Sequence, residues 1–192
     1  MKKTGIRVLL LLAVLMGGIS SEAATKGLAG RISVSGNLEK DRNSSKEEGE
    51  KSSSRSKTET QFYDLKVTAA NTGKTEGTFD VEWYFFKRPL DNKGKKGDTV
   101  LAGQGKKTIQ LKGMKRQVIP VQSEVLSWSE TKSSKSSSKK NSSSSSKKTI
   151  SGAVYGGYLV LLKADGEIIS RYSPDNKMKS DDWLREMSIP FQ

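Results

Sequence analysis

The chain has 192 residues, a formal net charge of +13, and neither cysteine nor histidine. The absence of cysteine excludes a disulfide framework, and the absence of both residue types removes thiol nucleophiles, the usual general base and most transition-metal ligands. A Ser/Lys dyad or a carboxylate pair stays open in principle, but no motif points to one. We therefore expect no enzyme activity, no catalytic residue, no metal site and no cofactor.

The N-terminus has the order of an export signal. A basic segment, MKKTGIR, precedes an apolar run over residues 8–19, and small residues stand at Ser21 and Ala23. This order predicts a signal peptide over residues 1–23. The run is shorter than the roughly 20 apolar residues of a membrane span, and a retained anchor is the alternative. We expect an exported protein, in the periplasm, at the outer-membrane surface or outside the cell.

The first predicted strand covers residues 30–38, where Ile32 and Val34 alternate with polar residues. This period of two is typical of a strand with one buried face. Residues 39–60 have mixed charge, many serines and almost nothing apolar. Such a composition buries too little surface to offset its ordering entropy, so we expect a mobile loop there.

The clearest hairpin follows, over residues 61–71 and 78–87. Both segments alternate with a period of two, and the intervening NTGKTEG has the composition of a turn. The outward positions of the first segment are polar: Asp64, Lys66 and Thr68. The residues expected to face the core are Tyr63, Leu65, Val67, Ala69, Phe79, Val81, Trp83 and Phe85.

The rest of the chain also predicts strands joined by turns. A single strand over 98–111 is expected, with two short strands as the alternative, and Pro120 favours an edge or a bulge in the next strand. The tract WSETKSSKSSSKKNSSSSSKKTISG predicts a second mobile loop over 129–149, and ADGE reads as a hairpin turn rather than a calcium loop. The remaining expected strands are 117–128, 150–163 and 167–173, and Ser180 caps a short helix at SDDWLREM.

About seven strands without intervening helices predict an all-β fold, an immunoglobulin-like antiparallel β-sandwich with a short C-terminal helix. We expect residues 24–192 to form one such domain, with loops 39–60 and 129–149 inside it. Alternating connections then gather these two loops and the loop 88–97 at one end of the sandwich. We assign Trp83 and Trp128 to its core, and Trp183 to packing of the last helix against an open end.

Two hairpins resemble a known family. The stretches LKVTAANTGKTEGTFDVEWYFF and GGYLVLLKADGEIISRYSP are similar to the B–C and F–G hairpins of bacterial immunoglobulin-like domains of the CARDB type. A further similarity is to exported immunoglobulin-like proteins compared with archaeal type IV pilus subunits. It implies a surface or assembly role, although a pilin keeps the hydrophobic N-terminal helix that predicted cleavage removes here. The fold itself implies no activity.

Positive charge is concentrated in the middle of the chain. Residues 87–116 hold ten Lys or Arg against two Asp, a net +8, and residues 129–149 hold six Lys against one Glu, a net +5. Such asymmetry favours an anionic glycan or lipid headgroup at the cell surface, with solubility or edge-strand protection as the alternative. The candidate polyanion-binding residues are Lys93, Lys95, Lys96, Lys106, Lys107, Lys112, Lys115, Arg116, Lys135, Lys139 and Lys140.

The sequence also suggests contact with another protein. Tyr84 and Phe86 point away from the core if Trp83 and Phe85 point inward, so they are candidates for contact with another protein, unless a loop covers them. The alternative function is therefore a periplasmic accessory or inhibitor protein that binds another protein through a strand edge or through this aromatic face, and strand edges could also mediate self-association. Nucleic acid is not expected as a partner, because export separates the protein from it and the aromatic residues lie apart from the lysines.

Overall fold

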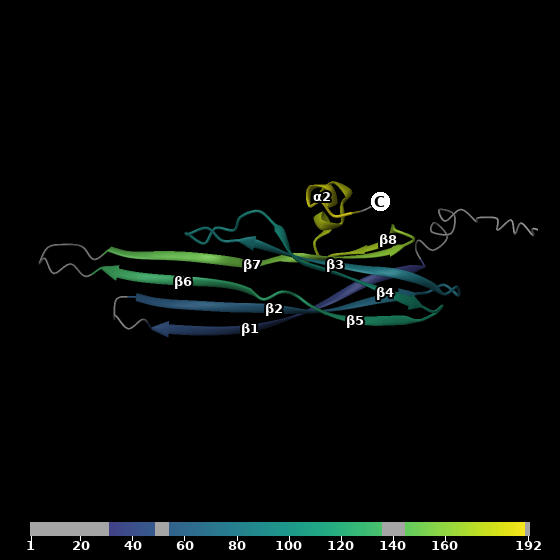
Figure 1. The fold of residues 1–192 in the computed structure, drawn as a ribbon, viewed down its shortest axis with the longest axis horizontal. Coiled ribbons are helices and arrows are strands. Elements are labelled where there is room, and N and C mark those ends of the chain that lie inside the picture. Colours follow the sequence, from purple (N-terminus) through teal and green to yellow (C-terminus); the bar gives the residue numbers. More distant parts are fainter. Residues whose placement is uncertain (1–30, 49–53, 136–144, 191–192) are drawn as a thin grey trace, which may run out of the picture.

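A computed structural model describes residues 31–48, 54–135 and 145–190. These residues form eight strands and two short helical segments (Figure 1). All strand pairs are antiparallel, which confirms the predicted all-β fold with a short C-terminal helix. The strands are β1 (Ile32–Glu48), β2 (Ser54–Asn71), β3 (Gly77–Pro89), β4 (Val100–Leu111), β5 (Arg116–Gln122), β6 (Leu126–Lys135), β7 (Ser145–Ala164) and β8 (Glu167–Tyr172), followed by the 3-10 helix η1 (Asn176–Lys179) and α2 (Asp181–Glu186).

Two sheets form a sandwich at one end of the molecule. In the first sheet β2 lies between β1 and β5, and in the second the order is β8-β7-β3-β4. Their facing sides bury the residues that alternation assigned to the core, and Val67, Ala69 and Val81 have no measurable exposure. Trp83 is only partly buried at the margin of this core. The two inward-facing rows therefore account for the stability of the sandwich.

The strands continue far beyond the sandwich. Residues 39–48, 54–61, 126–135 and 145–152 pair in the order β1-β2-β6-β7, and we call this four-stranded extension the arm (Figure 1). The predicted loops over 39–60 and 129–149 are thus wrong where the structure describes them, because most of those residues belong to hairpins. Residues 49–53 and 136–144, and the predicted signal peptide, lie outside the described residues.

Strand β7 belongs to both parts of the molecule. It pairs with β6 up to Gly152, opposite Trp128, and from Ala153 onward it pairs with β3. Gly152 has φ +109°, and a Cβ there would lie 2.3 Å from the carbonyl oxygen of Ser127. The predicted strand 117–128 is correspondingly split, since β5 and β6 pair with successive parts of β2 and are separated at residues 123–125.

The C-terminal segment covers the outer face of the second sheet. Tyr84 and Phe86 are buried there, with Met178, Trp183 and Leu184 packed against the same cluster. Of the two alternatives for these residues, the covered one is confirmed and the protein-contact one is wrong, because α2 and η1 occupy the face that they line. Trp183 packs on this face rather than on an open end. The N-cap prediction is confirmed, since Ser180 accepts a hydrogen bond from the Trp183 amide at 3.3 Å.

The ends of the molecule differ. At one end of the molecule lies the tip of the arm, where the described parts of the β1–β2 and β6–β7 pairs end (Figure 1). The β3–β4 connection points the same way, so the three long connections are on one side, as predicted. The β2–β3 and β4–β5 turns lie at the opposite end, where β1 begins. No helix within the described ranges is long and apolar enough to cross a membrane.

Candidate functional site

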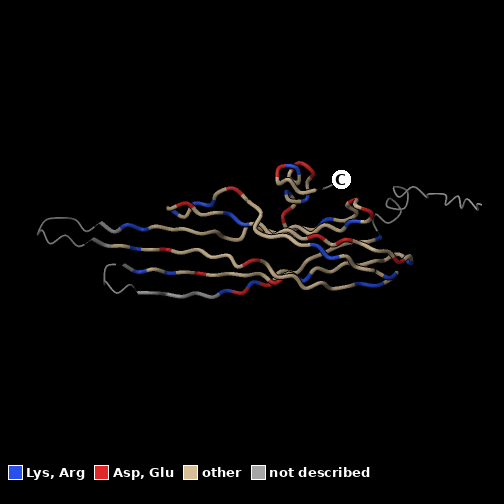
Figure 2. The backbone as a smooth tube through the Cα atoms, in the orientation of Figure 1, with Lys and Arg blue, Asp and Glu red and all other residues tan. Residues whose placement is uncertain are grey.

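The predicted cations do not form one surface. Those of the β3–β4 connection lie towards the arm, those of β4 lie along an edge strand, and those of the β4–β5 turn lie at the far end (Figure 2). Lys139 and Lys140 lie outside the described residues, and β6 ends at Lys135. Each group therefore has to be judged by its own surroundings.

The β3–β4 connection is held by an acidic residue. The Asp91 carboxylate accepts hydrogen bonds from the backbone amides of Lys95, at 2.8 Å, and Lys93, at 2.9 Å. These bonds, that of Lys95 first, hold the pKa of Asp91 below its usual range. Asp91 and Asp98 offset part of the charge of Lys93, Lys95 and Lys96, so this connection is only weakly basic.

On β4, Lys106 is already paired. Its Nζ lies 2.7 Å from Asp80 Oδ2 and 3.9 Å from Glu82 Oε1. The hydrogen bond to Asp80 raises the pKa of Lys106, and the same bond lowers that of Asp80. Lys107, its neighbour, is exposed on the other side of the strand. An anion would have to compete with two carboxylates for Lys106.

Two touching turns bring the remaining cations together. The Met114 amide donates to the Gly73 carbonyl at 2.9 Å, and the Asn71 amide donates to the Lys115 carbonyl at 2.8 Å. A Cβ on Gly113 would lie 2.1 Å from the carbonyl oxygen of Lys74, so only glycine permits this approach. We call the five cations on and beside these turns the basic pole: Arg31, Lys74, Lys112, Lys115 and Arg116.

The side chains of the basic pole are exposed and carry no ionic partner among the described residues. All five side chains are exposed, and within the described ranges none of them forms an ion pair. Glu76 is the acidic residue of the two turns, and Asp165 and Glu167 lie on the β7–β8 turn of the second sheet. Arg31 joins the group because its carbonyl accepts the Thr72 amide at 2.8 Å.

Met114 stands at the tip of this pole. Its side chain is 69% exposed, and its φ of 56° is a left-handed conformation that a side chain makes costly. Sequence reasoning found Lys112, Lys115 and Arg116 but missed Arg31, Lys74 and Met114. The available signal was a lysine in each turn sequence, NTGKTEG and KGMKR, but only the contact between the turns joins them.

The arm has two different faces. Directly paired residues of antiparallel strands share a face, so Thr58, Ser129 and Ser151 form one row, and Ser56, Thr131 and Thr149 form the next. Ser129 and Ser151 hydroxyls lie 2.9 Å apart. The opposite face is charged: Glu130 lies 2.9 Å from Lys148 and 3.2 Å from Lys132. Neither face resembles a hydrophobic core.

At the base of the arm a buried carboxylate organises polar side chains. Glu59, only 2% exposed, accepts hydrogen bonds from Arg42 and Gln61, and Tyr63 donates to Gln61 at 2.8 Å. Burial by itself raises the pKa of Glu59. Hydrogen bonds from Gln61, Arg42 and the Trp128 indole, together with the charge of Arg42, outweigh burial. The pKa of Glu59 is therefore below its usual range. This network replaces apolar packing where the core ends.

Two aromatic residues, Trp128 and Tyr155, lie beside this network. Trp128, assigned to the core from sequence, lies on the arm outside both hydrophobic clusters, with Lys57 Nζ 5.5 Å from its ring centroid. Tyr155 stacks on Tyr63 with ring centroids 4.2 Å apart, and its buried hydroxyl has no hydrogen-bond partner within the described residues. Burial raises the pKa of Tyr155.

The low pKa of Glu59 predicts acid sensitivity. Its stabilisation is complete above about pH 4.3, the ordinary pKa of glutamate, and is lost as the pH falls through the lower value of the folded state. We expect Glu59→Gln to cost about 1–3 kcal/mol at neutral pH and to flatten the decline of melting temperature between pH 7 and 3.5. Glu186→Gln, at an exposed position, is the control. Parallel melting curves for Glu59→Gln and the unmodified chain would contradict this expectation.

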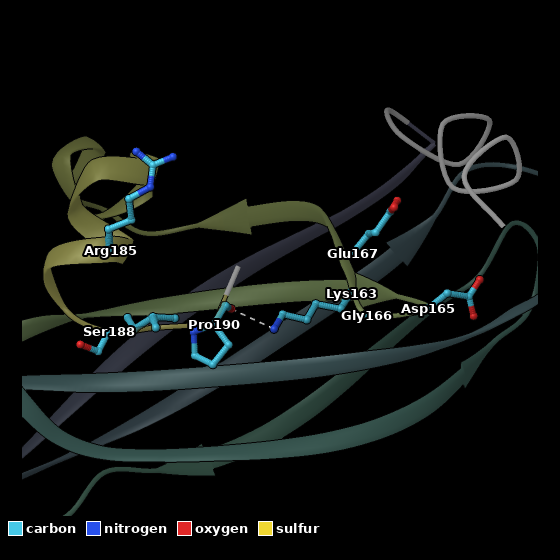
Figure 3. Close-up of a pocket in the computed structure, with 8 residues that line it drawn as sticks. Lys163, Asp165, Gly166, Glu167, Arg185, Ser188 and Pro190 are labelled. Carbon is cyan, nitrogen blue, oxygen red and sulfur yellow. Dashed lines mark hydrogen bonds between the residues drawn. The ribbon is translucent and has the colours of Figure 1, made fainter. Parts of the chain in front are cut away.

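A groove of about 990 Å³ lies beside the C-terminal segment (Figure 3). Its lysine is engaged, because Lys163 Nζ donates to the Pro190 carbonyl at 3.0 Å and lies 3.1 Å from Glu82 Oε2. Lys163 thus fastens the C-terminal segment to the sheet. Among the described residues there is no cluster of three or more acidic residues placed to hold a metal ion.

Comparisons with known proteins assign no family. No protein-family profile and no curated protein matches the chain. Among solved structures, a β-glucosidase from Kluyveromyces marxianus is 14% identical with a TM-score of 0.25, and the match covers 72% of this chain but 13% of the enzyme. A protein from Akkermansia muciniphila is 12% identical with a TM-score of 0.25, over 80% of this chain and 76% of that one. Similarities this low do not assign a function.

Proposed function

We propose that this protein is an exported, non-catalytic β-sandwich module that binds an anionic surface, either glycan or lipid headgroups. The basic pole carries the proposal: it gathers five exposed cations that have no ionic partner in the described structure. Lysine and arginine in such a group act on a polyanion as point charges and raise its local concentration. The signal-like N-terminus and the resemblance to CARDB-type and pilus-related domains support a role at the cell surface.

A second candidate function uses the arm. Strand β1 stands at the end of the strand order, so no other described strand pairs with its outer edge along residues 39–48. An extended edge can add a strand from another protein or from a second copy of this chain through backbone hydrogen bonds. This contact would not depend on the basic pole, and salt would weaken it little.

Salt distinguishes these functions. We expect the exported chain, residues 24–192, to bind a sulfated polysaccharide, lipopolysaccharide or phosphatidylglycerol vesicles in about 50 mM salt. Affinity should fall about tenfold or more by about 500 mM, because screening weakens exposed charges. Neutral dextran and phosphatidylcholine vesicles are the controls. Absence of binding at low salt, or binding that ignores salt, would contradict the proposal, and salt-resistant self-association would favour the strand edge.

A further inference from the structure

We infer that the basic pole is a membrane-contact surface, on which anionic lipid headgroups meet the five cations and the Met114 side chain enters the headgroup region. This inference rests on the proposed binding of an anionic surface and selects the ligand class. Three independent features of this end of the molecule support it: the exposed methionine, the arrangement of cations around it, and the point at which the chain enters the sandwich.

Met114 lies where a side chain is costly. At φ 56° glycine or asparagine would be tolerated more easily, yet the chain has a long apolar side chain there, 69% exposed and packed into neither hydrophobic cluster. Strained residues that contribute nothing to packing point to a role outside the fold. An exposed methionine at a turn tip is suited to a soft, apolar environment.

The cations around Met114 indicate which kind of apolar environment it enters. Lys112 and Lys115 flank the Gly113–Met114 tip, Arg116 follows, and Lys74 touches it through its backbone. A sulfated glycan or a nucleic acid would match the cations but has no hydrocarbon layer for a methionine to enter. The boundary between headgroups and acyl chains offers both, with negative charge outside and hydrocarbon beneath. The combination therefore favours anionic lipid.

The chain also enters the sandwich at this end. Strand β1 begins at Ile32, directly after Arg31, at the end of the molecule that carries the two turns (Figure 1). In the sequence, the apolar run over residues 8–19 precedes this point. The eleven residues between the run and Arg31 reach at most about 40 Å. While that run lies in a bilayer, during export or as an anchor, it keeps the basic pole within reach of the lipid surface.

Charge variants at the two ends of the molecule test this placement. Residues 24–192, which keep every described strand, would be bound to vesicles of phosphatidylcholine with 30% phosphatidylglycerol. Each cation at an anionic surface contributes about fivefold in affinity, so Lys112→Gln/Lys115→Gln/Arg116→Gln should weaken binding about a hundredfold. The matched control, Lys93→Gln/Lys95→Gln/Lys96→Gln, removes the same charge from the β3–β4 connection and should change affinity less than about threefold.

Met114 provides a second, charge-free test. Met114→Asn suits the left-handed backbone and removes the apolar group, so we expect about tenfold weaker vesicle binding with an unchanged or higher melting temperature. Undiminished binding would overturn the inference, as would equal losses in the two triple variants. Binding to the sulfated polysaccharide without binding to vesicles would overturn the membrane contact and leave the proposed function standing. Binding to neither the polysaccharide nor the vesicles would contradict both the membrane contact and the proposed function.

Discussion

Replacing Trp183 by alanine should lower the free energy of unfolding by about 3–5 kcal/mol. The side chain is 5% exposed and meets Phe86 edge to face, with ring centroids 4.8 Å apart and an interplanar angle of 80°. A six-residue helix has little stability in isolation, so α2 depends on this contact. Urea denaturation would measure the loss, and binding of a hydrophobic dye should rise because Tyr84 and Phe86 lose their cover.

Glu186→Ala is the matched control on the same helix. Its side chain is exposed, and alanine is a good helix former, so the free energy of unfolding should change by less than about 0.5 kcal/mol. If Trp183→Ala and Glu186→Ala had the same small effect, the C-terminal segment would not be an integral part of the fold. The outer face of the second sheet would then be available for a partner after all.

Gly152→Ala should be comparably harmful, at about 2–4 kcal/mol. The residue has φ +109°, which L side chains rarely adopt, and the new Cβ would approach the Ser127 oxygen to 2.3 Å and the Trp128 Cα to 2.6 Å. Both neighbours are backbone atoms of the paired strand, so relief requires β6 and β7 to separate. Chemical denaturation gives the total, and hydrogen exchange should show lost protection in 126–135 before the sandwich core.

Gly166→Ala is the control that separates the cost of a positive φ from the cost of a steric clash with the neighbouring strand. Gly166 also has a positive φ, of +88°, in the β7–β8 turn, but a Cβ there meets nothing within 4 Å. Its replacement should cost about 1–2 kcal/mol, from conformation alone. A cost at Gly152 no greater than that at Gly166 would mean that the two strands separate there without penalty.

The sandwich could be predicted because its signals are local. Alternation at Tyr63, Leu65 and Val67, and again at Phe79 and Val81, fixes which face is buried, and the structure buries these residues. Asp165 and Gly166 both adopt positive φ, as the ADGE turn requires. Burial of Tyr84 and Phe86 was not decided by these signals, since the cover comes from a segment about a hundred residues later.

The arm was missed for a different reason. Its strands are rich in serine, lysine and glutamate, which have weak strand preference and bury little apolar area. They pair because each has a long partner in register, and ladders such as Lys57 opposite Glu130 stabilise neighbours only once pairing exists. The basic pole was found in part, because Lys112, Lys115 and Arg116 lie within five residues of the sequence, whereas Arg31 and Lys74 reach it through contacts between turns.

The uninterrupted strands make the molecule a rigid spacer. β1, β2 and β7 run through both the sandwich and the arm, so the arm cannot swing as a tethered lobe without breaking many ladder hydrogen bonds at once. The 17 residues of β1 alone extend over about 55 Å. If the basic pole is bound to a surface, the hydroxyl rows of the arm are therefore held at a fixed distance from that surface. A pull along this axis would load the backbone bonds in shear, the direction in which paired strands share the force.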